Sequence, residues 1–379
     1  MTTPLRWAVG LRWAVGLLGA FAVTWGLGRF GVDSILVRDR DVALDTVSLR
    51  PGDRIRWRSE GYGDTLVGPH GLPGWTPREA GRRVLLWGDS QVEGLCLPDN
   101  QKLHRQVIDL IGDELDCDVL PLAKSGTDAR DWQAAIPPAK RLWSPDGHVW
   151  VITELNDLEA ILEPVPNPTA YRWNEPSPGF VRVAKRLGAD AFFAGAKRLL
   201  LDPDTGGLRR LDFRLGPRSG DSQASTRSGD SQANTRSGDS QASTRSGDGD
   251  CPIGMSEMTR EQRMVAVTRR LVELRRQIDT FWLIVFVPQG PSIDRGSATM
   301  HLDDYSLEDY VHAITALNDK GLVAIDMRDD FLSLWQNERR LPRGFHNGLP
   351  GAGHLNADGN RLIAAKIAEA LRNRFGDER

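Results

Sequence analysis

Cysteine is scarce in this chain, which has only Cys96, Cys117 and Cys251 among 379 residues. An odd number of cysteines leaves at least one thiol unpaired, so the sequence does not describe a disulfide framework. Cys96 follows the carboxyl end of one expected strand and Cys117 opens the next. The two thiols are therefore expected at opposite edges of a parallel sheet, about 16 Å apart. Because a disulfide joins Cα atoms no more than about 7 Å apart, we expect no Cys96–Cys117 bridge.

The sequence also lacks an excess of charge of either sign. Its 48 basic and 51 acidic residues give a formal net charge of −3 at pH 7, so no electrostatic attraction to nucleic acid is expected. It has neither a phosphate-binding glycine loop with a lysine nor a dinucleotide fingerprint, and we expect no cofactor. His301, Asp303 and Asp304 lie close in sequence but without the spacing of metal ligands, so no metal is expected.

The amino-terminal segment differs from the rest of the chain. Residues 13–28 carry no charge, and they lie between Arg12 and Arg29. If Arg12 reaches the lipid headgroups, the apolar stretch extends over residues 7–28, close to the roughly 20 residues of a spanning helix. The arginines favour a cytoplasmic amino terminus, and no small-x-small cleavage site follows. Residues 1–31 are therefore expected to be a single-pass membrane anchor, with a cleaved signal or a buried helix as alternatives.

The remaining chain is long enough for one large α/β domain with additions. Residues 32–82 contain short β-like pieces and are expected to form a membrane-proximal arm that packs on the main domain, residues 83–379. Continuous apolar runs in that domain predict strands at 84–88, 118–123, 148–153, 281–288 and 321–327. Amphipathic segments predict helices at 99–115, 127–139, 259–279, 306–319 and 357–375. This alternation predicts a flavodoxin-like, doubly wound parallel sheet of five strands with helices on both faces.

A long insertion, residues 158–258, interrupts this alternation. A helix is expected within it at residues 184–201. It also contains a nine-residue repeat, RSGDSQAST and close copies, over residues 218–250, with no apolar residue larger than alanine. Such a segment cannot bury enough apolar surface to offset its ordering entropy, so we expect a disordered loop. Calcium binding through its evenly spaced aspartates is the alternative, which the arginine in each copy disfavours.

Polar residues follow the expected strands at the edge where ligands of parallel sheets bind. Ser90 follows the first strand in VLLWGDSQVEG, Gly126 follows the second in AKSGTDA, and Asn156 follows the third in TELND. His354 lies just before the last helix in GAGHLNADG. GDSQ recurs three times in the repeat, but without a preceding strand to hold its hydroxyl, and these copies are rejected. Taken singly, each residue has an ordinary reading as a cap or a turn.

These four blocks, in this order, resemble those of the SGNH (GDSL-type) hydrolase superfamily over about residues 83–375 without the insertion. The resemblance implies that Ser90 attacks an acyl carbon and that His354 accepts its proton. It also implies an oxyanion hole made by the N–H groups of Ser90 and Gly126 and the side-chain amide of Asn156. Asp89 is better placed to hold the serine turn than to react.

Two positions depart from the family pattern. The family usually has an aspartate three residues before the histidine, and here that position is Gly351. We expect a backbone carbonyl near Gly351 to orient the imidazole in a Ser–His dyad, in preference to a distant acid such as Asp326 or Asp329. The block around the asparagine usually has a glycine where this chain has Glu154, which places a carboxylate near the oxyanion region.

The sequence therefore predicts a membrane-anchored, extracytoplasmic serine esterase that forms an acyl-enzyme on Ser90. Its expected partners are the membrane and an ester of a lipid or an O-acylated carbohydrate. An O-acyltransferase that modifies an exported polysaccharide is one alternative, because hydrolysis and transfer share the acyl-enzyme. A non-catalytic binding domain that kept the fold is another, and the absence of an aspartate at position 351 is its main support.

Overall fold

The structure is a computed structural model of the chain. It describes residues 3–26, 28, 31, 33–164, 177–186, 189, 192, 258–289, 292–293, 300–301, 305–317, 321–348 and 350–376. The repeat at residues 218–250, predicted to be disordered, lies outside the described residues, as does Cys251. Cys96 and Cys117 are buried free thiols.

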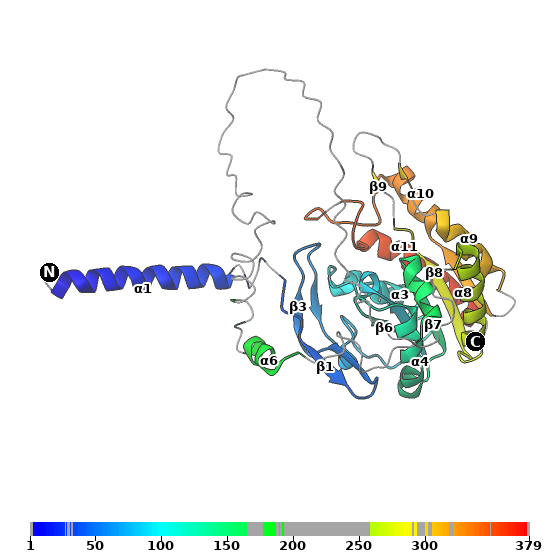
Figure 1. Cartoon of the computed structure of the whole chain (residues 1–379), viewed down its shortest axis with the longest axis horizontal. Coiled ribbons are helices and arrows are strands. Elements are labelled where there is room, and N and C mark those ends of the chain that lie inside the picture. Colours follow the sequence, from blue (N-terminus) through cyan, green and yellow to red (C-terminus); the bar gives the residue numbers. More distant parts are fainter. Residues whose placement is uncertain are drawn as a thin grey trace, which may run out of the picture.

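A five-stranded parallel sheet forms the centre of the molecule (Figure 1). Its strands are β5 (Arg82–Gly88), β6 (Cys117–Ala123), β7 (Gly147–Ile152), β8 (Phe281–Phe286) and β11 (Leu322–Asp326). They are arranged in the order β11-β8-β7-β5-β6, and each neighbouring pair is parallel. Every residue of β7 and β8 is buried, because helices cover both faces of the sheet. The predicted doubly wound sheet is thus confirmed.

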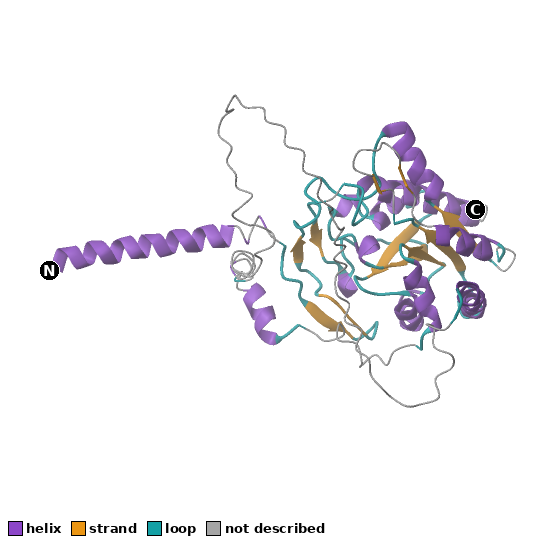
Figure 2. Cartoon of the chain, turned by 45° about the horizontal axis from the view of Figure 1, so that its top comes forward, coloured by secondary structure: helices purple, strands orange, loops and turns teal. Residues whose placement is uncertain are grey.

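Helices form a layer on each side of this sheet (Figure 2). One layer contains α4 (Ala129–Trp143), α5 (Leu155–Glu159), α8 (Arg260–Arg275) and α9 (Tyr305–Thr315). The other contains α3 (Leu103–Ile111), α10 (Arg328–Glu338) and α11 (Ala357–Phe375). The core of the first layer is rich in tryptophan: Trp150 makes edge contacts with Trp132 and Trp282. Large aromatic rings thus fill the space between the sheet and α4.

Several predicted helix boundaries need correction. The helix expected at residues 127–139 runs through Pro137 and Pro138 to Trp143. Prolines inside a helix each cost about 3 kcal/mol, but α4 buries Ala139 and Trp143 beyond them, which favours its continuation. The helix expected at 99–115 is shorter, with a 3-10 turn at Asp99–Gln101 before α3. The helix expected at 184–201 is described only as α6 (Gly179–Arg186), and α10 was not predicted.

The arm packs against the segment that follows Ser90. It consists of two antiparallel pairs, β1 (Arg38–Asp41) with β2 (Thr46–Leu49) and β3 (Arg54–Arg56) with β4 (Asp64–Leu66). A small core joins the arm to the segment that follows Ser90: Leu49, Ile55, Val67 and Leu95. The arm therefore reaches the carboxyl end of the sheet, where the candidate site lies.

The predicted transmembrane helix is not supported. Residues Thr3–Gly26 form the helix α1, which lies apart from the sheet (Figure 1). Within the described ranges, no helix combines the length and the apolar character needed to cross a membrane. Arg6 and Arg12 both lie inside α1, and its glycines add little hydropathy.

Candidate active site

Ser90 begins a single-turn helix, with one residue between it and the end of strand β5. The helix α2 (Ser90–Glu93) is capped by Asp89, whose carboxylate accepts a hydrogen bond from the backbone of Gln91 at 2.8 Å. The other carboxylate oxygen of Asp89 accepts a hydrogen bond from Thr153 Oγ1 at 3.0 Å. Asp89 therefore holds the serine turn against the end of β7, as the sequence predicts. Burial raises the pKa of Asp89 despite these hydrogen bonds.

Ser90 and His354 lie in hydrogen-bond contact. His354 Nε2 is 3.1 Å from Ser90 Oγ. The two segments are also joined beside this contact, because Leu355 donates its backbone N–H to Gln91 Oε1 at 2.8 Å. Asn356 then caps α11 by accepting from the backbone of Asp358 and Gly359. The structure thus brings together the serine and the histidine that the sequence pattern singled out.

The imidazole of His354 is oriented by Glu60 of the arm. Glu60 Oε2 lies 2.6 Å from His354 Nδ1, and Glu60 Oε1 accepts the backbone N–H of His354 at 2.8 Å. Burial alone would raise the pKa of Glu60, but the hydrogen bonds from His354 and the positive charge of Arg343 outweigh it and lower that pKa. A charged carboxylate on Nδ1 keeps the proton there and leaves Nε2 free to accept from the serine.

This arrangement corrects the predicted Ser–His dyad. Among the residues that the structure describes, Glu60 takes the role expected of a carbonyl near Gly351 or of an acid after the fifth strand. The carboxylate of Asp326 instead binds Arg328, through the backbone N–H at 3.0 Å and Nε at 2.7 Å. Asp329 lies in the first turn of α10. The sequence analysis missed Glu60 because this residue lies outside the alternating strands and helices. Its one sequence signal is its position between Ser59 and Gly61.

Two glycines allow the arm to approach the histidine loop this closely. Gly353 has a φ of 84°, and a Cβ there would collide with the Glu60 carboxylate. Gly61 has a φ of 72°, and a Cβ there would collide with the carbonyl of Cys96. Both positions therefore favour glycine on conformational and steric grounds. Asn347 adds a clamp, since it accepts from Gly61 N at 2.8 Å and donates to Gly61 O at 2.9 Å.

The buried Arg343 holds the loop that precedes His354 in place. Arg343 donates from Nε to the carbonyl of Pro288 at 3.0 Å and from Nη1 to the carbonyl of Gly353 at 3.1 Å. Its own carbonyl accepts the backbone N–H of Gly351 at 3.0 Å. Burial lowers the pKa of Arg343 to about 10, so the guanidinium stays charged at neutral pH. Arg343 thus ties the loop that precedes His354 to the segment after β8.

The expected oxyanion-hole residues lie on two further loops. Gly126 has a φ of 74°, and no atom lies within 4 Å of the position a Cβ would take. Its loop is tied to the end of β5 by a hydrogen bond from Lys124 N to Gly88 O at 3.2 Å. Asn156 is the second residue of α5, and it is exposed to solvent. The role of both residues in an oxyanion hole stays a prediction.

Acidic residues gather on the α5 side of the serine turn. Burial, followed by the negative charges of Asp89 and Glu154, raises the pKa of Asp157 to about 8. Asp157 is therefore largely protonated at neutral pH, while the exposed Glu154 lies close enough to influence it. Within the part of the chain that the structure describes, no three His, Cys, Asp or Glu side chains are grouped as a metal ion would need.

Comparisons with known proteins find only distant similarity. No family model matches the chain, and no curated protein matches it in sequence. An acetyl xylan esterase, AlAXEase, is 13% identical with a TM-score of 0.38, over 76% of this chain and 98% of that one. A catalytic mutant of an acetylxylan esterase from Geobacillus stearothermophilus is 9% identical with a TM-score of 0.37, over 78% and 95%. A putative lipolytic protein of the G-D-S-L family from Desulfitobacterium hafniense DCB-2 is 8% identical with a TM-score of 0.32, over 76% and 99%.

The similarity to these structures is too low to carry a substrate or a mechanism across. The strand order describes a flavodoxin-like doubly wound α/β fold, and Ser90 and His354 meet at the carboxyl edge of its sheet. The departure from the expected pattern is the acid, which comes from the arm instead of the histidine loop.

Proposed function

We propose that the protein is a serine ester hydrolase that works through an acyl-enzyme on Ser90. The observation that carries this proposal is the continuous chain of contacts from Glu60 through His354 to Ser90. A serine hydroxyl is a weak nucleophile at neutral pH, and a neighbouring base that is itself oriented by an acid activates it. The earlier support for a non-catalytic binding domain was a missing acid, and Glu60 fills that position.

In the first half-reaction the Ser90 oxygen bonds to the acyl carbon while its proton moves to His354 Nε2. The carboxylate of Glu60 stabilises the imidazolium that forms. The N–H groups of Ser90 and Gly126 and the Asn156 amide stabilise the oxyanion. When the ester bond breaks, the alkoxide leaves with the proton from His354. In the second half-reaction water gives its proton to His354, attacks the acyl-enzyme, and releases the acid and the free serine.

The proposed substrate is an uncharged ester of a lipid or an O-acylated carbohydrate. Glu154 supports the uncharged class, since its exposed carboxylate lies near enough to Asp89 and Asp157 to shift the pKa of both. A second negative charge on the substrate would be repelled there. An acyltransferase would use the same acyl-enzyme with a sugar hydroxyl in place of water.

A fluorophosphonate probe and p-nitrophenyl acetate test this proposal together. We expect the probe to label Ser90, and Ser90→Ala to lose both labelling and turnover. A label on Ser222, Ser231 or Ser240 of the repeat would overturn the assignment of the nucleophile. Nitrophenol release beyond one equivalent in water supports hydrolysis. A burst of one equivalent that turns over only after a sugar is added would instead assign an acyltransferase.

The cellular location is a separate proposal from the sequence. We propose a catalytic domain outside the cytoplasm because Arg6 and Arg12 precede the apolar residues 13–28, although no described helix qualifies as a membrane span. Fractionation of cells that express the full chain tests it. Recovery of the protein among soluble cytoplasmic proteins would contradict it without affecting the proposed chemistry.

A further inference from the structure

The loop that carries Gly126 is a tight turn. Thr127 donates its backbone N–H to the carbonyl of Lys124 at 3.2 Å, and Gly126, the third residue of the turn, has a φ of 74°. A positive φ at the third position is typical of a type II turn. The hydrogen bond that closes the turn leaves the Gly126 N–H unused, and this group has no acceptor among the described residues. The Gly126 N–H is therefore available to a ligand.

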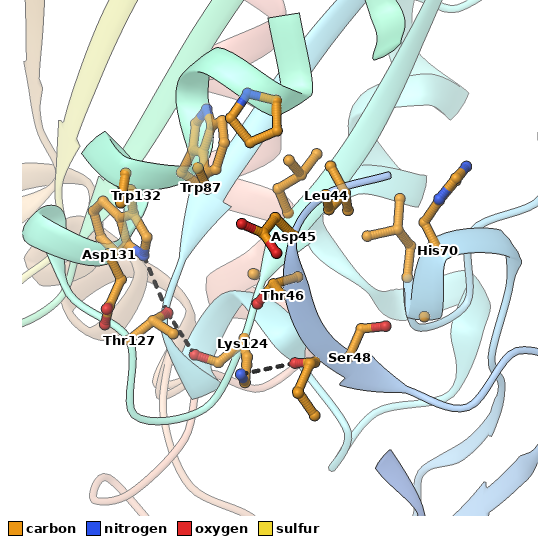
Figure 3. A pocket seen from close by; sticks show the side chains of 18 of the residues that line it. Leu44, Asp45, Thr46, Ser48, His70, Trp87, Lys124, Thr127, Asp131 and Trp132 are labelled. Atoms are coloured by element: carbon orange, nitrogen blue, oxygen red, sulfur yellow. Dashed lines mark hydrogen bonds between the residues drawn. The ribbon is translucent and has the colours of Figure 1, made fainter. Parts of the chain in front are cut away.

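Both ends of this turn are anchored to neighbouring elements. At one end, Lys124 Nζ donates to the carbonyl of Val47 in β2 at 2.8 Å. Figure 3 shows Thr127 at the other end, where its hydroxyl accepts from Trp132 Nε1 at 3.1 Å and donates to the carbonyl of Lys124 at 2.7 Å. These contacts leave Ser125, in the middle of the turn, to be held by another group.

Ser125 is held by Glu93, which belongs to the helix that Ser90 begins. The Glu93 carboxylate accepts the backbone N–H of Ser125 at 3.0 Å and also accepts the Ser125 hydroxyl. Only 2% of Glu93 is exposed. A buried carboxylate is costly unless it is hydrogen-bonded, so this contact favours a single position for Ser125.

The backbone of Glu93 is fixed as well. Lys102 is fully buried, and its Nζ donates to the carbonyls of Glu93, at 3.4 Å, and of Gly94. Carbonyls at the carboxyl end of a helix have no partner within that helix, so Lys102 supplies the missing donor. Glu93 therefore extends from a fixed point, three residues after Ser90, to the residue directly before Gly126.

We propose that Glu93 is a positioning residue for the oxyanion hole, an inference that rests on the proposed acyl-enzyme chemistry of Ser90. By holding Ser125 against α2, Glu93 keeps the N–H of Gly126 in a set position relative to the N–H of Ser90. The oxyanion forms only as the acyl carbon is attacked, so its donors lower the barrier when they already point at it. A donor that has moved away loses this effect.

Turnover of p-nitrophenyl acetate by Glu93→Leu and Glu93→Gln tests the proposal. Glu93→Leu removes the acceptor from a buried position, and we expect kcat to fall about 10²-fold while KM stays within about twofold. Glu93→Gln keeps an acceptor oxygen for Ser125 and should lose no more than about fivefold, the contribution of a typical hydrogen bond. A merely structural role would lower the melting temperature and leave the kcat of the folded protein unchanged.

Two further variants locate the effect. Ser125→Pro removes both donors to Glu93, while proline suits the second position of a type II turn, so it should reproduce the loss in Glu93→Leu. Combining the two substitutions should add little, since both remove the same contact. Asp118→Leu is the matched control, because Asp118 is also 2% exposed and accepts from Trp75 Nε1 at 3.3 Å. It lies at the amino end of β6, away from Ser90, so its loss should lower stability but not kcat.

The possible results separate this inference from the proposed function. Wild-type kcat in Glu93→Leu, or equal losses in Glu93→Leu and Glu93→Gln, would overturn the inference and leave the proposed function intact. An equal loss in Asp118→Leu would assign the effect to destabilisation and also overturn the inference. A wild type that releases no p-nitrophenol would overturn the proposed function and this inference with it. If Glu93→Leu does not fold, as judged by circular dichroism, Ser125→Pro decides, and its wild-type kcat would overturn the inference.

Discussion

Glu60 and His354 are 294 positions apart in the chain, yet both carboxylate oxygens of Glu60 contact His354. One oxygen meets the imidazole Nδ1 and the other accepts the backbone N–H, at 2.6 and 2.8 Å. The first contact sets the rotation of the ring and the second holds the loop on which the ring is carried. A backbone carbonyl would orient the ring but would bring no negative charge to stabilise an imidazolium.

Glu60→Gln should lower kcat by about 10²–10⁴ while the protein stays folded, because the charge that stabilises the imidazolium is lost. Turnover of p-nitrophenyl acetate measures this effect. Asp326→Asn is the control and should change kcat little. A large loss in Asp326→Asn with full activity in Glu60→Gln would reassign the acid.

Gly353→Ala should reproduce most of the loss seen in Glu60→Gln, because the added Cβ occupies the space of the carboxylate. Combining the two substitutions should then add little further loss, since both remove the same contact. Gly376→Ala has open space at its Cβ and serves as the control. Losses that multiply in the double variant would show that Gly353 acts through something other than Glu60.

Asn156→Ala should lower kcat by about 10²–10³, with a smaller change in KM, if its amide stabilises the oxyanion. The side chain is exposed, so the melting temperature should barely change. Asn100→Ala removes an equally exposed amide away from the serine turn and should leave turnover unchanged. Wild-type kcat in Asn156→Ala would remove the asparagine from the oxyanion hole without affecting the assignment of Ser90.

Asp157 makes the stability of the fold depend on pH. Its pKa is about 8 in the folded protein, against an ordinary value of 3.8, so the folded state keeps a proton that the unfolded chain releases. The free energy of unfolding therefore falls as the pH rises between these two values. Asp157→Asn should be more stable than the wild type at pH 8 and similar to it near pH 4. Urea denaturation at both pH values measures this, and equal stability of Asp157→Asn and the wild type at pH 8 would contradict it.

The sheet was readable from the sequence because strands buried on both faces appear as continuous apolar runs. The strand Phe281–Phe286 is buried at every position, and its uninterrupted run of hydrophobic residues predicts a strand. Ser90 and His354 were readable for a related reason, since each lies at the end of a regular element in a topology that brings those ends together. The closing helix, Ala357–Phe375, was predicted to the residue because Asn356 provides a cap and Phe375 ends its apolar face.

Glu60 could not be found in this way. Its position depends on how the irregular arm docks, and local periodicity carries no information on a contact between such distant segments. The extent of α4 was missed for a different reason: the burial of Trp143 decides it, and the local proline signal predicts the opposite. In both cases tertiary packing overrides what the neighbouring residues prefer.

Because Glu60 comes from the arm, the arm belongs to the catalytic unit. A boundary drawn before Arg82, where strands and helices begin to alternate, would separate the acid from its serine and histidine. A fragment that starts there would keep the nucleophile and the base but leave the imidazole without its counter-charge. The smallest unit with a complete triad therefore begins inside the arm. Where the residue three before the histidine is glycine, the acid should be sought upstream of the serine before the chain is set aside as inert.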